Sequence, residues 1–246
     1  MSAGNVVRAL ANRLKEYGLP PVNVILDTSI PRERLEKLMG EHANIYLFDL
    51  RDRRLTPEDI KRLTENEDGI DITSVRSLEP HLVFYDWFAH EAFNEDPDEI
   101  YVPYGSGRIF ENLLAHQERS VRNDTNGRKD PRLKIPLSRL VNMNILGAEP
   151  EKEDSVADKL TARFKPFRMF DDHDIGAVRS LLFTGENTGV YRVSEERINQ
   201  AHRLMSREFE TGPSASAGLA LYLDRFEKGE VNPNKKVLVV NTGKEI

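Results

Sequence analysis

The 246 residues include 35 basic and 41 acidic side chains, which gives a net charge of −6, and 39% of the residues are apolar. This length suits one large domain or two small ones, and the negative charge argues against a nucleic-acid binder. The chain has no cysteine, which excludes disulfides, thiolate metal ligands and cysteine nucleophiles. No apolar run approaches the roughly 18 residues that a membrane span requires.

The first part of the chain alternates helical and strand patterns. The opening residues, MSAGNVVRAL, lack the basic segment and apolar core of a secretory signal, so we expect a cytoplasmic protein. Apolar spacing and chain breakers then predict, in order, a helix over 6–14, a strand over 22–26, a helix over 32–39, a strand over 45–48 and a helix that starts at Thr56-Pro57. We expect residues 1–75 to form a small βα domain.

The same alternation continues over residues 76–246, which we expect to form a larger domain. The pattern predicts, in order, a helix over 79–93, a strand over 100–102 with a helix behind it, an exposed charged loop over 118–136, strands over 141–148 and 190–193, helices over 195–209 and 217–226, and a last strand over 237–240. Apolar strands alternating with helices predict an α/β fold with open, mostly parallel sheets. Ligands of such sheets bind beyond the carboxyl ends of the strands.

One short stretch, VPYGSGRIFENLLAH at 102–116, places two glycines between a strand and a helix. Gly105 and Gly107 have two interpretations. Glycine lets the backbone turn sharply, and free N–H groups at a helix start form a cup for a phosphate. The short motif alone leaves both open, and Thr242 with Gly243 would reach the same edge of the sheet.

Several segments together resemble the fold type II pyridoxal-phosphate enzymes, the group of threonine synthase, cysteine synthase and the tryptophan synthase β-chain. Five blocks follow the order of that family, which are SAGN at 2–5, GSGR at 105–108, ILGAEP at 145–150, PSASA at 213–217 and VLVVNTG at 237–243. The resemblance implies that fold and pyridoxal 5′-phosphate as the cofactor. It also implies a small amino-acid substrate and a homodimer.

The resemblance carries roles onto individual residues. Asn5 would bind the 3′-oxygen of the cofactor, and Ser2, Ala3 and Gly4 would bind a substrate carboxylate. The phosphate would lie against the five residues Gly105, Ser106, Gly107, Arg108 and Ile109. Thr242 would face the pyridine nitrogen. Arg108 replaces a glycine of the family pattern, so its side chain either adds a contact to phosphate or obstructs the cup.

The chain departs from the family pattern in its lysines. The lysine that binds the cofactor covalently precedes the SSGN-like loop in the family, whereas all twelve lysines here follow it. We therefore expect an N-terminally truncated form of the fold with no catalytic residue of its own, which is either a fragment of a longer protein or a truncated relative without covalent catalysis. Lys165, between aromatic residues, is the basic residue considered as a substitute; such a lysine is more often a loop residue that extends its charge to water.

Simpler roles are open for several of these residues. Asn5 is a common type of helix cap, Ser214 and Ser216 are suited to start a helix, and Thr242 is suited to bind backbone groups at a strand end. The acidic cluster with one histidine at 171–174 is suited to a cation or to a helix start, and we expect no metal site.

Three functions remain open on the sequence. The first is a pyridoxal-phosphate-dependent lyase or transferase of amino-acid metabolism, of the threonine synthase type, that acts by β- or γ-elimination or replacement. The second is a non-catalytic ligand-binding or interaction module that keeps the fold, and the third is an unrelated doubly wound phosphate or nucleotide binder. The third lacks a Walker lysine and a GxGxxG after its first strand.

Overall fold

The computed structural model describes residues 5–49, 55–68, 86–105, 107–161 and 185–243. The chain forms two compact units: the elements up to residue 68 belong to the first and those from residue 86 to the second. The expected domain boundary after residue 75 lies outside the described residues and stays a prediction. Among the described residues, no helix is long and apolar enough to cross a membrane.

The first unit is built on two parallel strands, β1 (Val22–Asp27) and β2 (Ala43–Phe48). Its helices are α1 (Asn5–Glu16), α2 (Arg32–Met39) and α3 (Pro57–Leu63). A small core joins α1, β1 and α2 through Val7, Val24, Leu26 and Leu38. The predicted helix start at Thr56 is confirmed, because its hydroxyl accepts from the N–H of Asp59 while the Asp59 carboxylate accepts from the N–H of Thr56.

The second unit contains a four-stranded parallel sheet in the order β5-β4-β3-β6. Its strands are β3 (Glu99–Pro103), β4 (Asn144–Pro150), β5 (Gly189–Val193) and β6 (Val237–Val239). Every residue of β3 and β4 is buried, as expected for strands covered on both faces. The predicted α/β class with parallel sheets is therefore confirmed.

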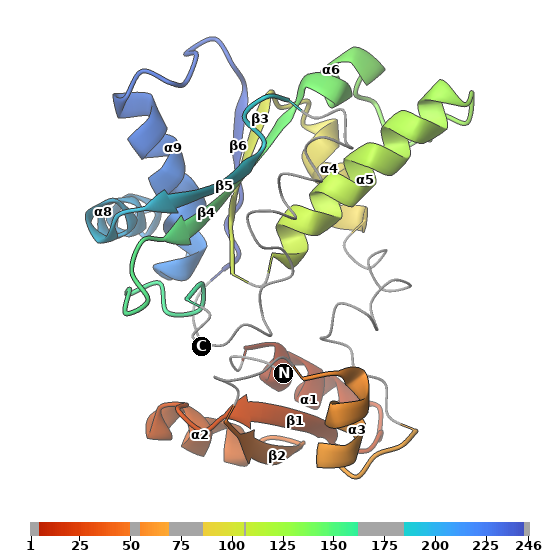
Figure 1. The fold of residues 1–246 in the computed structure, drawn as a ribbon, viewed down its shortest axis with the longest axis vertical. Coiled ribbons are helices and arrows are strands. Elements are labelled where there is room, and N and C mark those ends of the chain that lie inside the picture. The colour runs from red at the N-terminus through yellow and green to blue at the C-terminus, as the bar shows by residue number, and fades with distance from the viewer. Residues whose placement is uncertain (1–4, 50–54, 69–85, 106, 162–184, 244–246) are drawn as a thin grey trace. The chain divides into compact units, whose positions relative to one another are not determined.

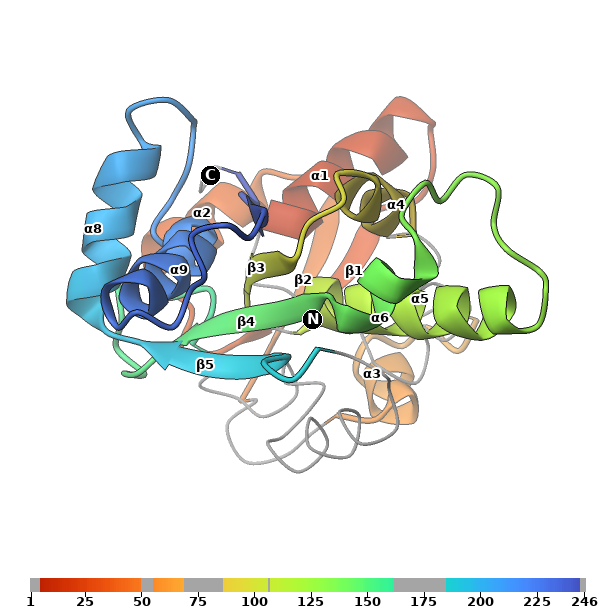
Figure 2. The ribbon, with the colours of Figure 1, turned by 90° about the horizontal axis from the view of Figure 1, so that it is seen from above.

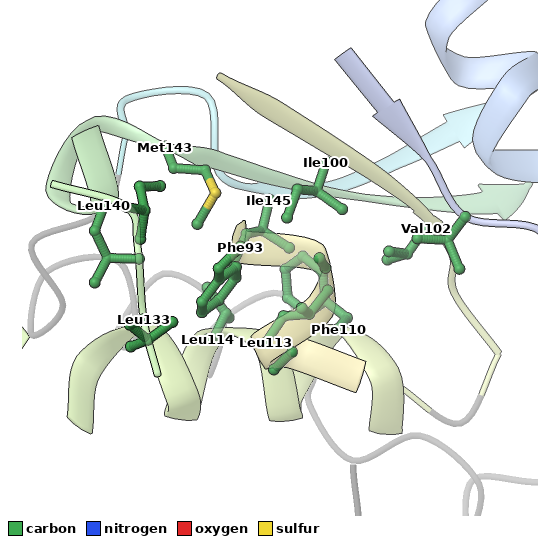
Figure 3. Close-up of a cluster of buried hydrophobic side chains, with 14 of the residues drawn as sticks. Phe93, Ile100, Val102, Phe110, Leu113, Leu114, Leu133, Leu140, Met143 and Ile145 are labelled. Carbon is green, nitrogen blue, oxygen red and sulfur yellow. The ribbon is translucent and has the colours of Figure 1, made fainter. Parts of the chain in front are cut away.

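Helices cover both faces of this sheet (Figures 1 and 2). One face carries α4 (Asp86–Asn94), α5 (Arg108–Thr125) and α6 (Leu137–Asn142), and the other carries α8 (Glu195–Met205), the short 3-10 turn η3 (Ser214–Ser216) and α9 (Ala217–Glu227). Figure 3 shows Phe110 and Leu113 of α5 packed with Phe93 of α4 under the strand residues Ile100 and Ile145. These side chains pack α4 and α5 against this face of the sheet.

Three predicted boundaries in the second unit are wrong. Residues 118–125 continue α5 and are not a loop, because Ser120 is buried and Val121 packs against the core, which extends the apolar side of the helix. The strand predicted over 141–148 begins only at Asn144, since α6 occupies the residues up to Asn142. The helix predicted to end at residue 209 ends at Met205.

Candidate functional site

The turn between β3 and α5 is shaped by Gly107. This residue has φ of +83° and is the N-cap of α5, a left-handed conformation that glycine adopts without strain. A Cβ on it would lie 3.2 Å from a ring carbon of Tyr104, whose own ring packs edge-on against Phe110 at 5.6 Å between centroids. The turn therefore needs glycine both for its backbone angle and for the space beside Tyr104.

The first turn of α5 presents backbone donors at this glycine. The N–H of Glu111 donates to the carbonyl of Gly107 at 2.8 Å, which closes the first helical bond. The N–H groups before it have no carbonyl partner within their own helix, and no described side chain caps this end. Arg108 and Ile109, both half-buried, are the first two residues of the helix. Such an end, with the positive pole of the helix dipole, attracts an anion.

A second segment packs on the turn from the side of β4. A Cβ on Gly105 would lie 3.0 Å from the carbonyl oxygen of Lys159 and 3.2 Å from Cδ2 of Leu160. The loop that carries these residues is anchored to the start of α8, because Ser155 Oγ donates to Glu195 Oε2 at 2.6 Å. Gly105 thus serves a close approach of two backbones. The sequence patterns contain no signal for this contact, since the two segments are far apart in the chain.

Thr242 follows β6 at the same edge of the sheet. The register pairs Tyr101 with Val239, and the N–H of Val240 donates to the carbonyl of Tyr101 at 2.9 Å. Continuing this register by count sets Thr242 level with Tyr104, where β3 enters the glycine turn. The structure therefore brings Gly105, Gly107, Arg108 and Ile109 to the edge of the sheet at which β6 also ends, and the exposed Thr242 follows the end of β6 by three residues.

The described residues do not test the other candidate residues. Asn5 is the first residue of α1 in the first unit, and its side chain lies outside the described residues. Also outside them are Ser2, Ala3, Gly4, Ser106, Lys165 and the acidic cluster at 171–174. Their suggested roles stay predictions. The described residues contain no group of three or more side chains suited to hold a metal ion.

The sequence analysis overlooked the carboxyl of Glu111 and gave Ser214 only a role at a helix start. One carboxylate oxygen of Glu111 is buried and has no hydrogen-bond partner among the described residues. Burial raises the pKa of Glu111 to about 7, against the opposing effect of the Arg108 charge. The hydroxyl of Ser214, just before α9, is also buried without a described partner. The sequence did contain a signal that could have pointed to Glu111, because an acidic residue stands one helical turn after the glycine loop.

Comparison with known proteins identifies the family of the chain. A family model described as pyridoxal-phosphate dependent enzyme matches residues 1–243. The chain belongs to this family of pyridoxal-phosphate-dependent enzymes. The predicted family and cofactor are therefore confirmed. No curated protein sequence matches the chain significantly.

Several solved structures share the fold. Serine racemase from Dictyostelium discoideum matches with a TM-score of 0.63 and 18% identity, over 100% of this chain and 75% of that one. Cysteine synthase from Entamoeba histolytica matches at 0.60 and 14%, over 99% and 66%. Threonine deaminase isoform 2 from Solanum lycopersicum matches at 0.57 and 14%, over 100% and 68%.

The donor set at the carboxyl edge suits the phosphate of the cofactor of a pyridoxal-phosphate-dependent enzyme. Its donors are backbone N–H groups at an uncapped helix start, the arrangement that phosphates prefer. Arg108 adds a positive charge at the first helical position. The buried carboxyl of Glu111 suits the same ligand only in its neutral form, and its raised pKa favours that form.

Proposed function

We propose that this chain binds pyridoxal 5′-phosphate through the first turn of α5 and acts on a small amino acid by elimination or replacement at the β or γ carbon. The observation that carries the proposal is the start of α5 at a left-handed glycine, where no described side chain caps the helix, in a chain of this family. The cofactor, when bound, withdraws electrons from the bonds at the substrate α carbon. The chain's own task is to hold and orient it.

Each residue at the edge has a defined task in this proposal. The N–H groups from Gly107 to Ile109 bind the phosphate, and Thr242 offers a hydroxyl to the pyridine nitrogen. A hydroxyl, unlike a carboxylate, leaves that nitrogen without a proton, which supports elimination and replacement. Asn5 binds the 3′-oxygen, and Ser2, Ala3 and Gly4 bind the carboxylate of the amino acid. A cytoplasmic homodimer of the threonine synthase type is part of the proposal.

The test is a calorimetric titration of the intact chain with pyridoxal 5′-phosphate. Gly107→Asp places bulk and a negative charge in the cup, and we expect it to weaken binding at least about a hundredfold. Gly127→Asp is the matched control, because Gly127 also has a positive φ, of +71°, but lies at the other end of α5 with no atom near its Cβ position. Equal affinity of the two variants would overturn the proposed cup.

The reaction is tested separately from binding. In a form of the protein that carries the covalent lysine and has bound the cofactor, we expect release of a keto acid from L-serine or L-threonine. The identity of the product distinguishes elimination from replacement. A second function is a module that keeps this fold and binds the cofactor without catalysis. Binding of the cofactor without keto-acid release in any form of the protein would support this second function.

A further inference from the structure

The carboxyl group of Glu111 lies in the turn of α5 that the proposed phosphate would approach. Glu111 closes the first helical bond to Gly107 at 2.8 Å. Side chains of a helix lean toward its N-terminus, so this carboxyl lies over the turn that Gly107 and Arg108 form. Its oxygen Oε2 is buried and has no hydrogen-bond partner among the described residues. One of its two carboxylate oxygens is thus cut off from water and from hydrogen-bond donors of the described residues, which disfavours the charged form.

We propose that Glu111 keeps its proton when a phosphate-bearing ligand occupies the start of α5, so that ligand binding takes up a proton and weakens as the pH rises. This inference rests on the proposed function of the same turn. An ionised Glu111 and a phosphate dianion would share one partly buried region, where like charges repel more strongly than in water. The two charges therefore exclude each other, and protonation of Glu111 admits the ligand.

The charges around Glu111 leave this competition in place. Arg108, three residues earlier on the same side of α5, lowers the pKa of Glu111 but does not offset the effect of burial, and the pKa stays at about 7. The other charged groups of neighbouring segments mostly pair with one another. These groups are Asp86, His90, His116 and Arg119 between α4 and α5, Glu118 with Arg122 on α5, Arg139 with Asp96 and Asp98 at α6, and Glu149 with Arg192 on the strands. Lys159, whose main chain packs on Gly105, has a buried amine nitrogen.

The experiment titrates the intact chain with sodium sulfate and with pyridoxal 5′-phosphate by calorimetry at several pH values. Sulfate does not change its own charge over the range used, so its binding reports on the protein alone. Above about pH 7 we expect the wild-type affinity for sulfate to fall by up to about tenfold per pH unit, the dependence for one proton. Above about pH 7, titrations in buffers of different ionisation enthalpy should show that sulfate binding takes up about one proton.

Glu111→Gln is the decisive variant, because it keeps the shape of the side chain and removes the titration. We expect its sulfate affinity to be nearly independent of pH and about tenfold above wild type at about pH 8. Glu118→Gln is the matched control, since Glu118 lies two turns further along α5 and pairs with Arg122. It should follow the wild type. Equal pH dependence in wild type and Glu111→Gln would overturn the inference.

A measurement without ligand keeps the inference independent of the cofactor. The folded state holds the Glu111 proton up to a pKa of about 7, whereas the unfolded state loses it near 4.5. Stability of the wild type should therefore fall between these pH values relative to Glu111→Gln, and the deficit should persist above them.

If neither sulfate nor pyridoxal 5′-phosphate binds at any pH, the proposed function and this inference both fail. If both bind without proton uptake, this inference alone fails.

Discussion

Glu99, the first residue of β3, forms an ion pair of 2.9 Å with Lys235, which lies 136 residues further along the chain. The Glu99 side chain is only 1% exposed. It also accepts from the hydroxyl of Tyr101 at 2.7 Å and from the amide of Asn144 at 3.4 Å. Burial and the nearby Glu99 carboxylate raise the pKa of Tyr101, so this hydroxyl remains a donor. The group joins β3, β4 and the approach to β6 at the amino edge of the sheet, away from the candidate site.

The first prediction is that Lys235→Met destabilises the second unit by about 2 kcal/mol, because a buried carboxylate loses its cation. Lys236→Met is the control, since Lys236 pairs with an exposed Glu95 and should change stability by less than about 1 kcal/mol. Urea unfolding followed by the fluorescence of Trp87, the one tryptophan of the chain, measures both. Equal effects of the two substitutions would show that the Glu99 ion pair does not stabilise the fold.

The second prediction concerns Gly105. In Gly105→Ala, the added methyl group would meet the carbonyl of Lys159 at 3.0 Å, so the loop before residue 161 must shift. We expect a loss of about 1 to 3 kcal/mol and weaker binding of pyridoxal 5′-phosphate. Gly40→Ala adds the same methyl group where no atom lies within 4 Å, and its unfolding midpoint should stay near that of wild type. A neutral Gly105→Ala would mean that the two segments do not pack closely.

Local features of the fold were predictable from sequence, whereas contacts between distant segments were not. The glycine turn after β3 and the cap at Thr56 follow from residue types within a few positions. The length of α5 was misjudged because its last two turns are rich in charged residues, although Ser120 is buried and Val121 packs on the core. The residue pattern around either position does not predict that Lys159 packs on Gly105. Burial decides the state of Glu111, and burial depends on the whole fold.

The third prediction concerns a polar cluster between α4 and α5. Arg119 donates to Asp86 at 2.6 Å and approaches Nδ1 of His116 at 3.2 Å. Burial lowers the pKa of His116 to about 4; Asp86 and Asp130 oppose this shift, and His90 and Arg119 add to it. His116 is therefore neutral at pH 7, and its contact with Asp86 at 3.5 Å is not an ion pair there.

The sign of the pH dependence follows from the lowered pKa. An unfolded histidine takes up its proton near pH 6.5, whereas His116 in the folded protein stays neutral until the pH falls to about 4. Stability is therefore complete above about pH 6.5 and falls as the pH drops toward 4. His116→Asn, which keeps an acceptor for Arg119, should flatten this fall. His202→Asn, on α8, should leave the profile of urea unfolding midpoints against pH as in wild type; identical profiles for all three proteins would contradict the prediction.

The fourth prediction compares two serines before α9. Ser216 is fully buried and donates to the carbonyl of Gly212 at 2.9 Å, so Ser216→Ala should cost about 1 kcal/mol. The buried hydroxyl of Ser214 has no partner among the described residues, so Ser214→Ala should be neutral or stabilising. Thermal unfolding of the ligand-free protein measures both. A larger loss for Ser214→Ala than for Ser216→Ala would reverse the assignment of the two hydroxyls.

The last prediction concerns covalent attachment of the cofactor to this chain. A lysine that attacks the cofactor must stand over its reactive carbon with its amine partly deprotonated. The family resemblance places that lysine before the SAGN segment, and the lysines of this sequence all follow it. The structure gives the positions of two of these lysines relative to the candidate site. The main chain of Lys159 packs on Gly105, whereas Lys235 pairs with Glu99 at the opposite edge of the sheet. We expect neither to become the covalent residue.

The measurement mixes the 246-residue chain with pyridoxal 5′-phosphate, reduces with borohydride and maps the label by mass spectrometry. We expect weak labelling spread over exposed lysines, with no stoichiometric site and no keto-acid release. The same mixture with Gly107→Asp provides the control, since labelling that does not depend on the phosphate cup should be unchanged by it. One stoichiometric label that disappears in Gly107→Asp, on Lys159 or Lys165 in particular, would show that the chain supplies its own covalent lysine, and the assignment of that lysine to a place before the SAGN segment would then be wrong.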